Sequence, residues 1–467
     1  MAYTQLESVV PLGAGPTDKP VLRGLDTPDY DNILSCIRCG LCLSVCPTYN
    51  VELAEAQSPR GRVALLRAVE EARLAASSPG LKEHMYHCLD CRACQTVCPS
   101  GVKVGELVLM GRAQAEQHIR PSFVEWAVKR VAFHLVLVSA ERLRLFTWPI
   151  WLYQATGLQA IIRATRLLHR LPGNLRLVGS MEELLPPIPR VPLHEDLPQT
   201  VLATTPRRHR VGFFLGCMMS VLLRETSEAT VRVLARAGCD VITPRHQACC
   251  GAPHIEEGDP TSQRRFARRN VDLFAGLDLD YIVTDCAACG AELKGYGRLL
   301  ADESRYAERA AAFSAKVRDI TELLVEIGAA PPTGRVDARV TYDEPCHLCH
   351  AQGIRSQPRQ VLASIPGVEF VELEESDWCC GSAGVYNVTH AARAERILDR
   401  KLERVAKTGA QILATGNPGC LLQLQAGVRR AGLKMDVIHP VQVLDRAFSN
   451  QAAEYKHKSR ERGRSDG

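Results

Sequence analysis

One cysteine pattern occurs twice near the start of the chain, and it constrains the fold more than any other feature. The first copy reads Cys36-Ile-Arg-Cys39-Gly-Leu-Cys42-Leu-Ser-Val-Cys46-Pro47. The second copy reads Cys88-Leu-Asp-Cys91-Arg-Ala-Cys94-Gln-Thr-Val-Cys98-Pro99. Both follow C-x2-C-x2-C-x3-C-P, a spacing that holds [4Fe–4S] clusters. Each copy can wrap one side of a cubane with three thiolates in a single tight turn.

The fourth cysteine of each copy points away from that turn. In two-cluster ferredoxins the corresponding cysteine binds the other cluster. The sequence therefore predicts two clusters with crossed ligands: Cys36, Cys39, Cys42 and Cys98 on one, and Cys88, Cys91, Cys94 and Cys46 on the other. A zinc site would not need the fourth cysteine and its proline. A disulfide framework would imply a secreted chain.

Composition argues against secretion. The 19 cysteines occur mainly in C-x2-C and C-C groups, which are typical of metal binding in a reducing compartment. The net charge of +5 is modest, so nucleic acid is not expected as a partner. We find no signal-peptide pattern and no long apolar window that could span a membrane. We expect a cytoplasmic protein, either free or peripheral on the cytoplasmic face of a membrane.

Changes of pattern divide the chain into segments. The cluster domain is expected to be α-helical, because 62–76 and 104–118 show helical spacing of apolar residues and Ser58 can cap the first helix. The expected segments are an extended arm at 1–25, the cluster domain at 26–120, a basic helical segment and Pro-rich linker at 121–206, two repeats at 207–332 and 333–450, and a flexible polar tail at 451–467.

The helical segment at 121–176 is basic and apolar, and it contains Trp126, Trp148 and Trp151. Three interpretations stay open. The segment could form core helices with a solvated basic face, fill a groove on a partner subunit, or lie on an anionic bilayer.

The second half of the chain is an internal duplication of an α/β unit. Expected strands at 210–216, 240–243 and 281–284 alternate with helices, and the order recurs at 339–342, 368–373 and 412–415. The cysteines after these strands recur at even offsets: 129 residues from Cys217 to Cys346, 130 from Cys249 to Cys379, and 131 from Cys289 to Cys420. Alternating strands and helices predict parallel sheets, so the fold class is multidomain α+β and α/β.

Cysteines at the carboxyl ends of parallel strands should converge. The expected pockets are Cys217, Cys249, Cys250, Cys286 and Cys289 in the first repeat, and Cys346, Cys379, Cys380 and Cys420 in the second. Asn417 stands where the first repeat has Cys286. Because consecutive strand residues point apart, a C-C pair suits a cluster with several irons better than one tetrahedral ion. The alternative is buried reduced cysteine, which also explains Cys239.

The pattern C-x31-C-C-x35-C-x2-C after a ferredoxin-like domain resembles the cysteine-rich CCG domain. That domain occurs in glycolate, lactate and glycerol-3-phosphate oxidoreductase subunits and in heterodisulfide reductases. The chain is most similar to glycolate oxidase iron–sulfur subunits. The residues that carry this likeness are Ser58-Pro-Arg-Gly-Arg62, Phe214-Leu-Gly-Cys217-Met-Met-Ser220, Ala267-Arg-Arg-Asn270, Asp377-Trp-Cys-Cys-Gly-Ser-Ala-Gly384 and Ala414-Thr-Gly-Asn-Pro-Gly-Cys-Leu-Leu-Gln-Leu-Gln425.

The resemblance implies a hetero-oligomer in which a flavin subunit with FAD oxidises glycolate to glyoxylate. This chain would carry the electrons onward to a membrane quinone. The resemblance also implies two [4Fe–4S] clusters on the eight cysteines of the doubled motif, and one or two further non-cubane clusters in the CCG repeats.

No catalytic residue is expected on this chain. No Gly-rich dinucleotide fingerprint follows a strand, and hydride removal from a hydroxy acid needs a flavin or nicotinamide. The alternatives are the same relay for D-lactate or glycerol 3-phosphate, a catalytic subunit like heterodisulfide reductase that uses the CCG pockets, and a scaffold that holds zinc.

Overall fold

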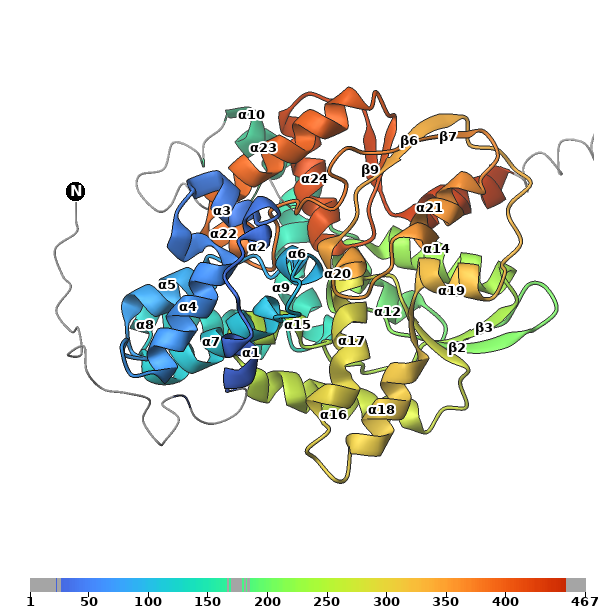
Figure 1. Cartoon of the computed structure of the whole chain (residues 1–467). Helices are drawn as coiled ribbons and strands as arrows, with labels where there is room; N and C mark the ends of the chain where they lie inside the picture. Colours follow the sequence, from blue (N-terminus) through green and yellow to red (C-terminus); the bar gives the residue numbers. More distant parts are fainter. Residues whose placement is uncertain are drawn as a thin grey trace, which may run out of the picture. The chain divides into compact units, whose positions relative to one another are not determined.

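The computed structural model describes residues 22, 27–165, 168, 179, 182 and 185–450 (Figure 1). Most of the predicted arm, part of the linker and the predicted tail at 451–467 therefore lie outside the described residues. The chain forms two compact units. Unit 1 comprises Met1–Phe133, Gly251–Arg265 and Gly381–Ile397, and unit 2 comprises His134–Cys250, Phe266–Cys380 and Leu398–Gly467.

The regular elements of unit 1 are helical wherever the structure describes them, as predicted. They are α1 (Tyr30–Leu34), α2 (Leu41–Ser44), α3 (Pro47–Glu52), a 3-10 helix at Glu55–Gln57, α4 (Pro59–Glu70), α5 (Pro79–Tyr86), α6 (Ala93–Thr96), α7 (Val104–His118), α8 (Phe123–Val131), α15 (Ala252–Glu256) and α22 (Tyr386–Thr389). The predicted helix at 104–118 is confirmed as α7.

Helix α4 differs from the helix predicted at 62–76. It begins three residues earlier, because Ser58 Oγ accepts a hydrogen bond from Gly61 N at 2.9 Å and Pro59 occupies the first turn. It ends at Glu70, because Ala72 adopts a left-handed φ of 54°. The backbone N–H of Arg73 then turns back to the carbonyl of Ala68, which closes the helix.

A hydrophobic core supports the doubled cysteine motif. Leu66, Val69 and Met85 are fully buried in this core together with residues of α7. Several motif cysteines pack against its edge, namely Cys36, Cys88, Cys94 and Cys98. The motif loops therefore rest on a packed helical base.

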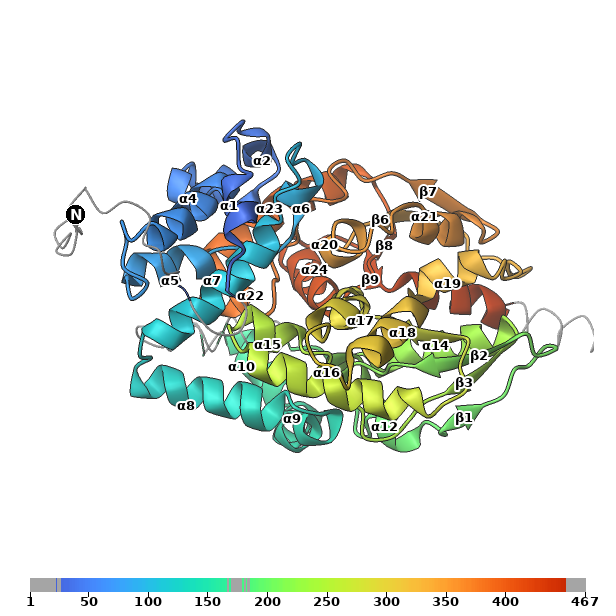
Figure 2. The same ribbon diagram turned by 60° about the horizontal axis from the view of Figure 1, so that its bottom comes forward.

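Unit 2 contains two sheets whose parallel strands follow equivalent orders, apart from the additional edge strand β1 in the first, which agrees with the predicted duplication (Figure 2). The strands of the first sheet run β1-β3-β2-β4-β5, and those of the second run β7-β6-β8-β9. Their bounds are β1 Thr200–Val201, β2 His209–Phe213, β3 Cys239–Ile242, β4 Tyr281–Thr284, β5 Val317–Asp319, β6 Ala338–Tyr342, β7 Val368–Val371, β8 Ile412–Ala414 and β9 Asp436–Ile438.

The pairs are parallel except that of β1 with β3, as a βαβ pattern requires. The register is equivalent in both sheets. Val211 on the central strand β2 pairs with Val241 and Tyr281, and the corresponding Val340 on β6 pairs with Phe370 and Ile412. Strand β1 lies inside the predicted linker and was not expected there.

Helices connect and cover these strands. They are α9 (Ala140–Ala155), α10 (Leu158–Thr165), α12 (Leu193–Asp196), α13 (Cys217–Leu222), α14 (Arg224–Arg236), α16 (Pro260–Ala275), α17 (Ala287–Leu299), α18 (Ala307–Lys316), α19 (Ile320–Glu326), α20 (Cys346–Cys349), α21 (Ser356–Ala363), α23 (Ala391–Lys407) and α24 (Pro418–Arg430). Figure 2 shows α14 beside the first sheet and α21 beside the second. Helices α16 and α23 continue from unit 1 into unit 2.

The basic helical segment at 121–176, called the Trp-rich segment below, contributes α8 to unit 1, and α9 and α10 to unit 2. Helix α8 contains no buried residue, which does not fit the core-helix interpretation. Trp126 on α8 is 52% exposed and Trp148 on α9 is 55% exposed. Among the helices that the structure describes, none combines the length and the apolar character needed to cross a bilayer.

A buried carboxyl in unit 2 gives a testable dependence of stability on pH. Asp319 caps α19, and its side chain accepts hydrogen bonds from the N–H and hydroxyl of Thr321. Burial raises the pKa of Asp319 from 3.8 to about 6. The folded state therefore holds the proton more tightly than the unfolded chain. The contribution of this carboxyl to the free energy of unfolding is therefore fully present below about pH 4, and it is lost as the pH rises through about 6.

We expect Asp319→Asn to keep the cap and to remove this titration. At pH 7 the variant should be more stable than the wild type by up to about 3 kcal/mol, and near pH 4 the two should match. Urea unfolding followed by circular dichroism at several pH values measures the difference. A variant that is less stable at pH 7 would show that the lost cap outweighs the burial of charge.

Candidate metal centres

The two copies of the doubled motif share an unusual backbone. Arg38 and Gly40 in the first copy have φ values of 57° and 88°, and Asp90 and Arg92 at the matching positions have 47° and 61°. Left-handed residues between right-handed ones turn backbone N–H groups towards one centre. Only glycine adopts this φ without strain, so Arg92 costs about 1–2 kcal/mol where the first copy has Gly40.

The structure brings the eight motif cysteines together in two groups. A cavity of about 30 Å³ is lined by Cys36, Cys39, Cys42, Cys94 and Cys98. A second cavity of about 20 Å³ is lined by Cys46, Cys88, Cys91 and Cys94. Each group joins the three-cysteine run of one copy to the fourth cysteine of the other, as the crossed ligation requires. This donor set fits two [4Fe–4S] clusters, and the individual ligands stay a prediction.

A buried arginine supports the group around Cys46. Arg62 is 1% exposed and donates hydrogen bonds to Thr48 Oγ1 at 3.2 Å and to Gln57 Oε1 at 3.1 Å. Thr48 Oγ1 in turn lies 3.3 Å from Cys46 Sγ. The sequence motif Ser58-Pro-Arg-Gly-Arg62 contains this arginine, but its spacing alone assigned it no role. The arginine and threonine hold the Cys46 thiol in place.

A second arginine lies close to the same group. Arg112 is 5% exposed, and its Nη2 donates to the carbonyl of Cys88 at 2.5 Å. Burial raises the pKa of the Cys94 thiol well above its ordinary value, and the charge of Arg62 opposes that rise. A bound metal would deprotonate such a thiol. Buried positive charge favours the more negative, reduced state of a cluster, so we expect these arginines to raise its reduction potential.

The first CCG pocket lies at the carboxyl ends of three parallel strands. Cys217 begins α13 after β2, Cys249 and Cys250 follow β3, and Cys286 caps α17 after β4. Hydrogen bonding with Cys249, and then burial, raises the pKa of the Cys217 thiol well above its usual range. Cys250 bonds instead to Cys289. The two members of the C-C pair thus have different partners, although they lie in a loop after β3 and not in a strand.

The second pocket has the equivalent position in its own sheet. Cys380 Sγ lies 3.3 Å from Cys420 Sγ, and Cys346 bonds to Cys379. This bond from Cys379 lowers the pKa of Cys346 well below its ordinary value. These four thiols provide one ligand fewer than the first pocket. Cluster binding in the two CCG pockets stays a prediction.

Asn417, which stands where the first repeat has Cys286, connects the two repeats. Its Oδ1 accepts a hydrogen bond from Ala288 N at 3.1 Å and lies 3.9 Å from Cys286 Sγ. Its Nδ2 lies 3.8 Å from Cys420 Sγ. The side-chain oxygen is therefore engaged with the first turn of α17. No sequence signal indicated this contact, because it joins residues 129 positions apart.

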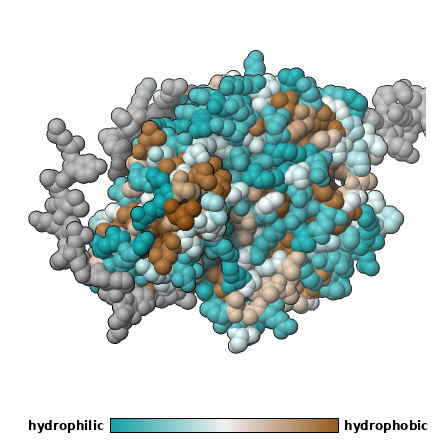
Figure 3. Space-filling model, in the orientation of Figure 1, coloured by the Kyte–Doolittle hydropathy of each residue, from teal (hydrophilic) through white to brown (hydrophobic). Residues whose placement is uncertain are grey.

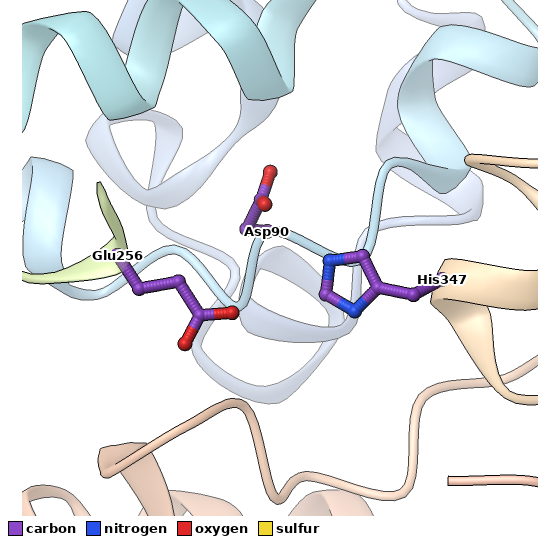
Figure 4. Close-up of side chains that lie close together, drawn as sticks. All are labelled: Asp90, Glu256 and His347. Carbon is purple, nitrogen blue, oxygen red and sulfur yellow. The ribbon is translucent and has the colours of Figure 1, made fainter. Parts of the chain in front are cut away.

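Among the described residues, one further group of side chains is of the types that bind metals, and one of its members, Asp90, belongs to the second cysteine motif. Figure 4 shows Asp90, Glu256 and His347. The first two belong to unit 1 and His347 belongs to unit 2. We therefore assign no metal to this group.

A doubled cluster motif followed by two cysteine-ended α/β repeats defines an iron–sulfur protein of the kind that serves oxidoreductases. Family models match the same regions: a 4Fe-4S dicluster domain at 32–102, a cysteine-rich domain at 211–294 and 340–425, and the linker region of the glycolate oxidase iron-sulfur subunit at 125–185. The Trp-rich segment at 121–176 overlaps this linker from residue 125 onwards, including α9, α10 and most of α8.

Two relatives align over nearly their whole length. The probable glycolate oxidase iron-sulfur subunit of Bacillus subtilis (strain 168) is 39% identical over 433 residues, 91% of this chain and 96% of the relative. The glycolate oxidase iron-sulfur subunit of Escherichia coli (strain K12) is 30% identical over 434 residues, with the same coverage. Lactate utilization protein A of Bacillus subtilis (strain 168) is 28% identical over 237 residues, 50% of this chain and 99% of that protein. The chain belongs to the family of glycolate oxidase iron–sulfur subunits.

Proposed function

We propose that this chain is the electron-transfer subunit of a glycolate oxidoreductase complex. A partner flavin subunit with FAD would oxidise glycolate to glyoxylate, which releases two electrons and two protons. The [4Fe–4S] clusters would supply one-electron carriers between that flavin and a quinone-type acceptor. Family membership and the two groups of motif cysteines support this role.

The exposed surface around the first cysteine motif is the observation that most directly supports the electron-transfer role. Cys39 is exposed, and its neighbours Ile37 and Leu41 are 68% and 55% exposed. Leu34 and Leu53, on the chain segments that flank this motif, are also exposed, at 45% and 74%. Figure 3 shows hydrophobic surface over the region where Figure 1 draws α2 and α6. Exposed apolar patches are typical of interaction sites, and a partner seated here would come close to the first cluster.

Co-purification with the flavin partner tests the proposal. We expect the complex to reduce ferricyanide with glycolate, and to do so at least about tenfold more slowly with D-lactate or glycerol 3-phosphate. We expect Ile37→Asp to lower this rate by about tenfold or more, because a charge would be desolvated at the docking surface. Its iron content should stay unchanged.

Leu202→Asp is the matched control, since Leu202 is likewise exposed, at 67%, but belongs to unit 2 and not to the unit that contains the motif. Activity with D-lactate alone would reassign the substrate. A chain that never co-purifies with a flavoprotein would refute the relay.

A further inference from the structure

A cavity of about 220 Å³ lies beside Cys217 in unit 2, and the electron relay described above does not use it. Its walls come from the start of α9, from α12, from the end of β2 and from the loop 243–248 after β3. We propose that this cavity binds the headgroup of a quinone. This inference rests on the proposed function, because it locates the acceptor of that relay.

The volume of the cavity suits one substituted ring. A cavity of about 150 Å³ can hold benzene, whereas sites for drug-sized ligands occupy roughly 300–1,000 Å³. At about 220 Å³ the cavity is too small to enclose a whole flavin or dinucleotide. A quinone ring with small substituents needs a volume between that of benzene and that of a drug-sized ligand, so it suits this cavity.

Two carboxylates, Glu141 and Glu195, and two guanidinium groups, Arg144 and Arg245, lie around the cavity, so their formal charges balance, which favours an uncharged ligand. Glu195 forms an ion pair with Arg144, and Glu141 Oε1 lies 3.4 Å from His246 Nδ1. Arg245 donates to the carbonyl oxygens of His194 and Leu197. The donors of Arg245 are thus taken up by two carbonyl oxygens rather than offered to a carboxylate substrate. A neutral quinone would disturb none of the pairs.

One polar atom at the cavity wall, His194 Nε2, makes no hydrogen bond, although it lies 3.8 Å from Glu195 Oε1. His194 Nδ1 lies 2.9 Å from Ser220 Oγ, and Ser220 is fully buried. His194 Nε2 is buried without a hydrogen bond to any described residue. Burial lowers the pKa of His194, so the imidazole is neutral near pH 7. A buried, unsatisfied ring nitrogen needs an explanation, and a ligand carbonyl or hydroxyl would satisfy it.

The walls of the cavity are held in place before any ligand binds. Gln247 Oε1 accepts from Leu215 N at 3.0 Å, and Gln247 Nε2 donates to Phe213 O at 3.0 Å. His246 adopts a left-handed φ of 61° in the same loop. Strained residues of this kind persist where the surroundings fix them, and they cluster at binding sites. The loop is therefore preorganised.

The apolar surface of α9 and α10 supplies a path for the tail of a quinone. Helix α9 begins at the cavity with Ala140, and Cys249 N bonds to Val138 O at 3.2 Å just before it. Leu145 and Trp148 on α9 are 71% and 55% exposed, and Ile161 on α10 is 61% exposed. An isoprenoid tail would cover such side chains, whereas a small polar ligand would leave them in water.

Photolabelling of the intact complex with an azido-substituted short-tail benzoquinone tests the site. We expect labelled peptides to contain residues of 140–144, 194–197 or 243–248, and excess unlabelled quinone to suppress the labelling. Equilibrium dialysis with the same quinone then compares variants. Ala140→Phe, which fills the cavity, should weaken binding at least about tenfold. Ala312→Phe, at an exposed position of α18, should bind like the wild type.

Labels confined to other peptides, or equal affinity of Ala140→Phe and the wild type, would overturn the proposal. The labelling map uses the wild type, so it decides the question even if Ala140→Phe does not fold. Ferricyanide reduction with glycolate serves as a separate readout. If that activity persists while the cavity stays unlabelled, this inference fails and the relay stands. If the activity is absent, the relay itself fails.

Discussion

Replacing Cys46 with alanine is expected to remove the cluster of the second motif and to leave that of the first. Cys46 follows the first motif's three-cysteine run, yet it lines the same cavity as Cys88 and Cys91. Iron content should fall by about four per chain. Electron paramagnetic resonance of the reduced protein should lose the signal that is also lost in Cys88→Ala.

Cys239→Ala is the matched control for this experiment. Cys239 is fully buried in the first sheet of unit 2, and it belongs to neither motif group. Its replacement should leave iron unchanged. If Cys46→Ala instead loses the signal that Cys36→Ala loses, the ligation is not crossed. The number of iron atoms per wild-type chain is also informative. About eight would indicate that the CCG pockets hold no cluster, and about twelve to sixteen would indicate further clusters there.

Replacing Lys401 with methionine is expected to cause a large loss of stability, because it breaks a buried ion pair of unit 2. The ammonium of Lys401 lies 2.8 Å from Asp343 Oδ1, and the two side chains are 0% and 1% exposed. Lys401 also donates to the carbonyls of Glu375 and Ser376. Removing one partner leaves a buried, uncompensated charge, which costs about 3–5 kcal/mol. Urea unfolding at pH 8 measures this loss.

Two comparisons separate the buried charge from other effects. Arg446→Met breaks an exposed pair with Asp436 and should cost less than about 1 kcal/mol. Burial raises the pKa of Asp343 to about 6, so the loss in Lys401→Met should shrink when the pH is lowered to 5 and the carboxyl takes up a proton. Adding Asp343→Asn should restore most of the stability at pH 8. A loss that persists in the double variant would point to packing rather than charge.

Features set by local sequence could be predicted. Ser58 and Pro59 indicate where α4 begins, and the cysteines after β2 and β3 lie at strand ends because the βαβ order requires it. Strand β1 was missed because it has two residues and pairs at a sheet edge with a segment forty residues away. The end of α4 was missed because the left-handed Ala72 has no glycine to mark it.

Contacts between distant segments were beyond sequence reasoning. The link from Asn417 to Ala288 depends on how two helix starts meet within unit 2, and the position of Arg62 beside Thr48 depends on packing inside unit 1. The cavity beside Cys217 is built from four segments between residues 140 and 248. Spacing predicts which residues share a strand end, but it does not predict the space left between separate elements.

The interleaved course of the chain bears on how this protein can be dissected genetically. Unit 1 includes two segments from the second half of the chain, Gly251–Arg265 and Gly381–Ile397. Each segment begins at the glycine that follows a C-C pair. Arg112 Nη1 on α7 donates a hydrogen bond to the carbonyl of Glu256 at 2.7 Å, so the segment Gly251–Arg265 is bonded to α7. A gene fragment that ends near residue 133 would encode a cluster module without these pieces. Expression of the ferredoxin-like portion alone should therefore give an unstable product, and a circular permutant would preserve the unit better than a truncation.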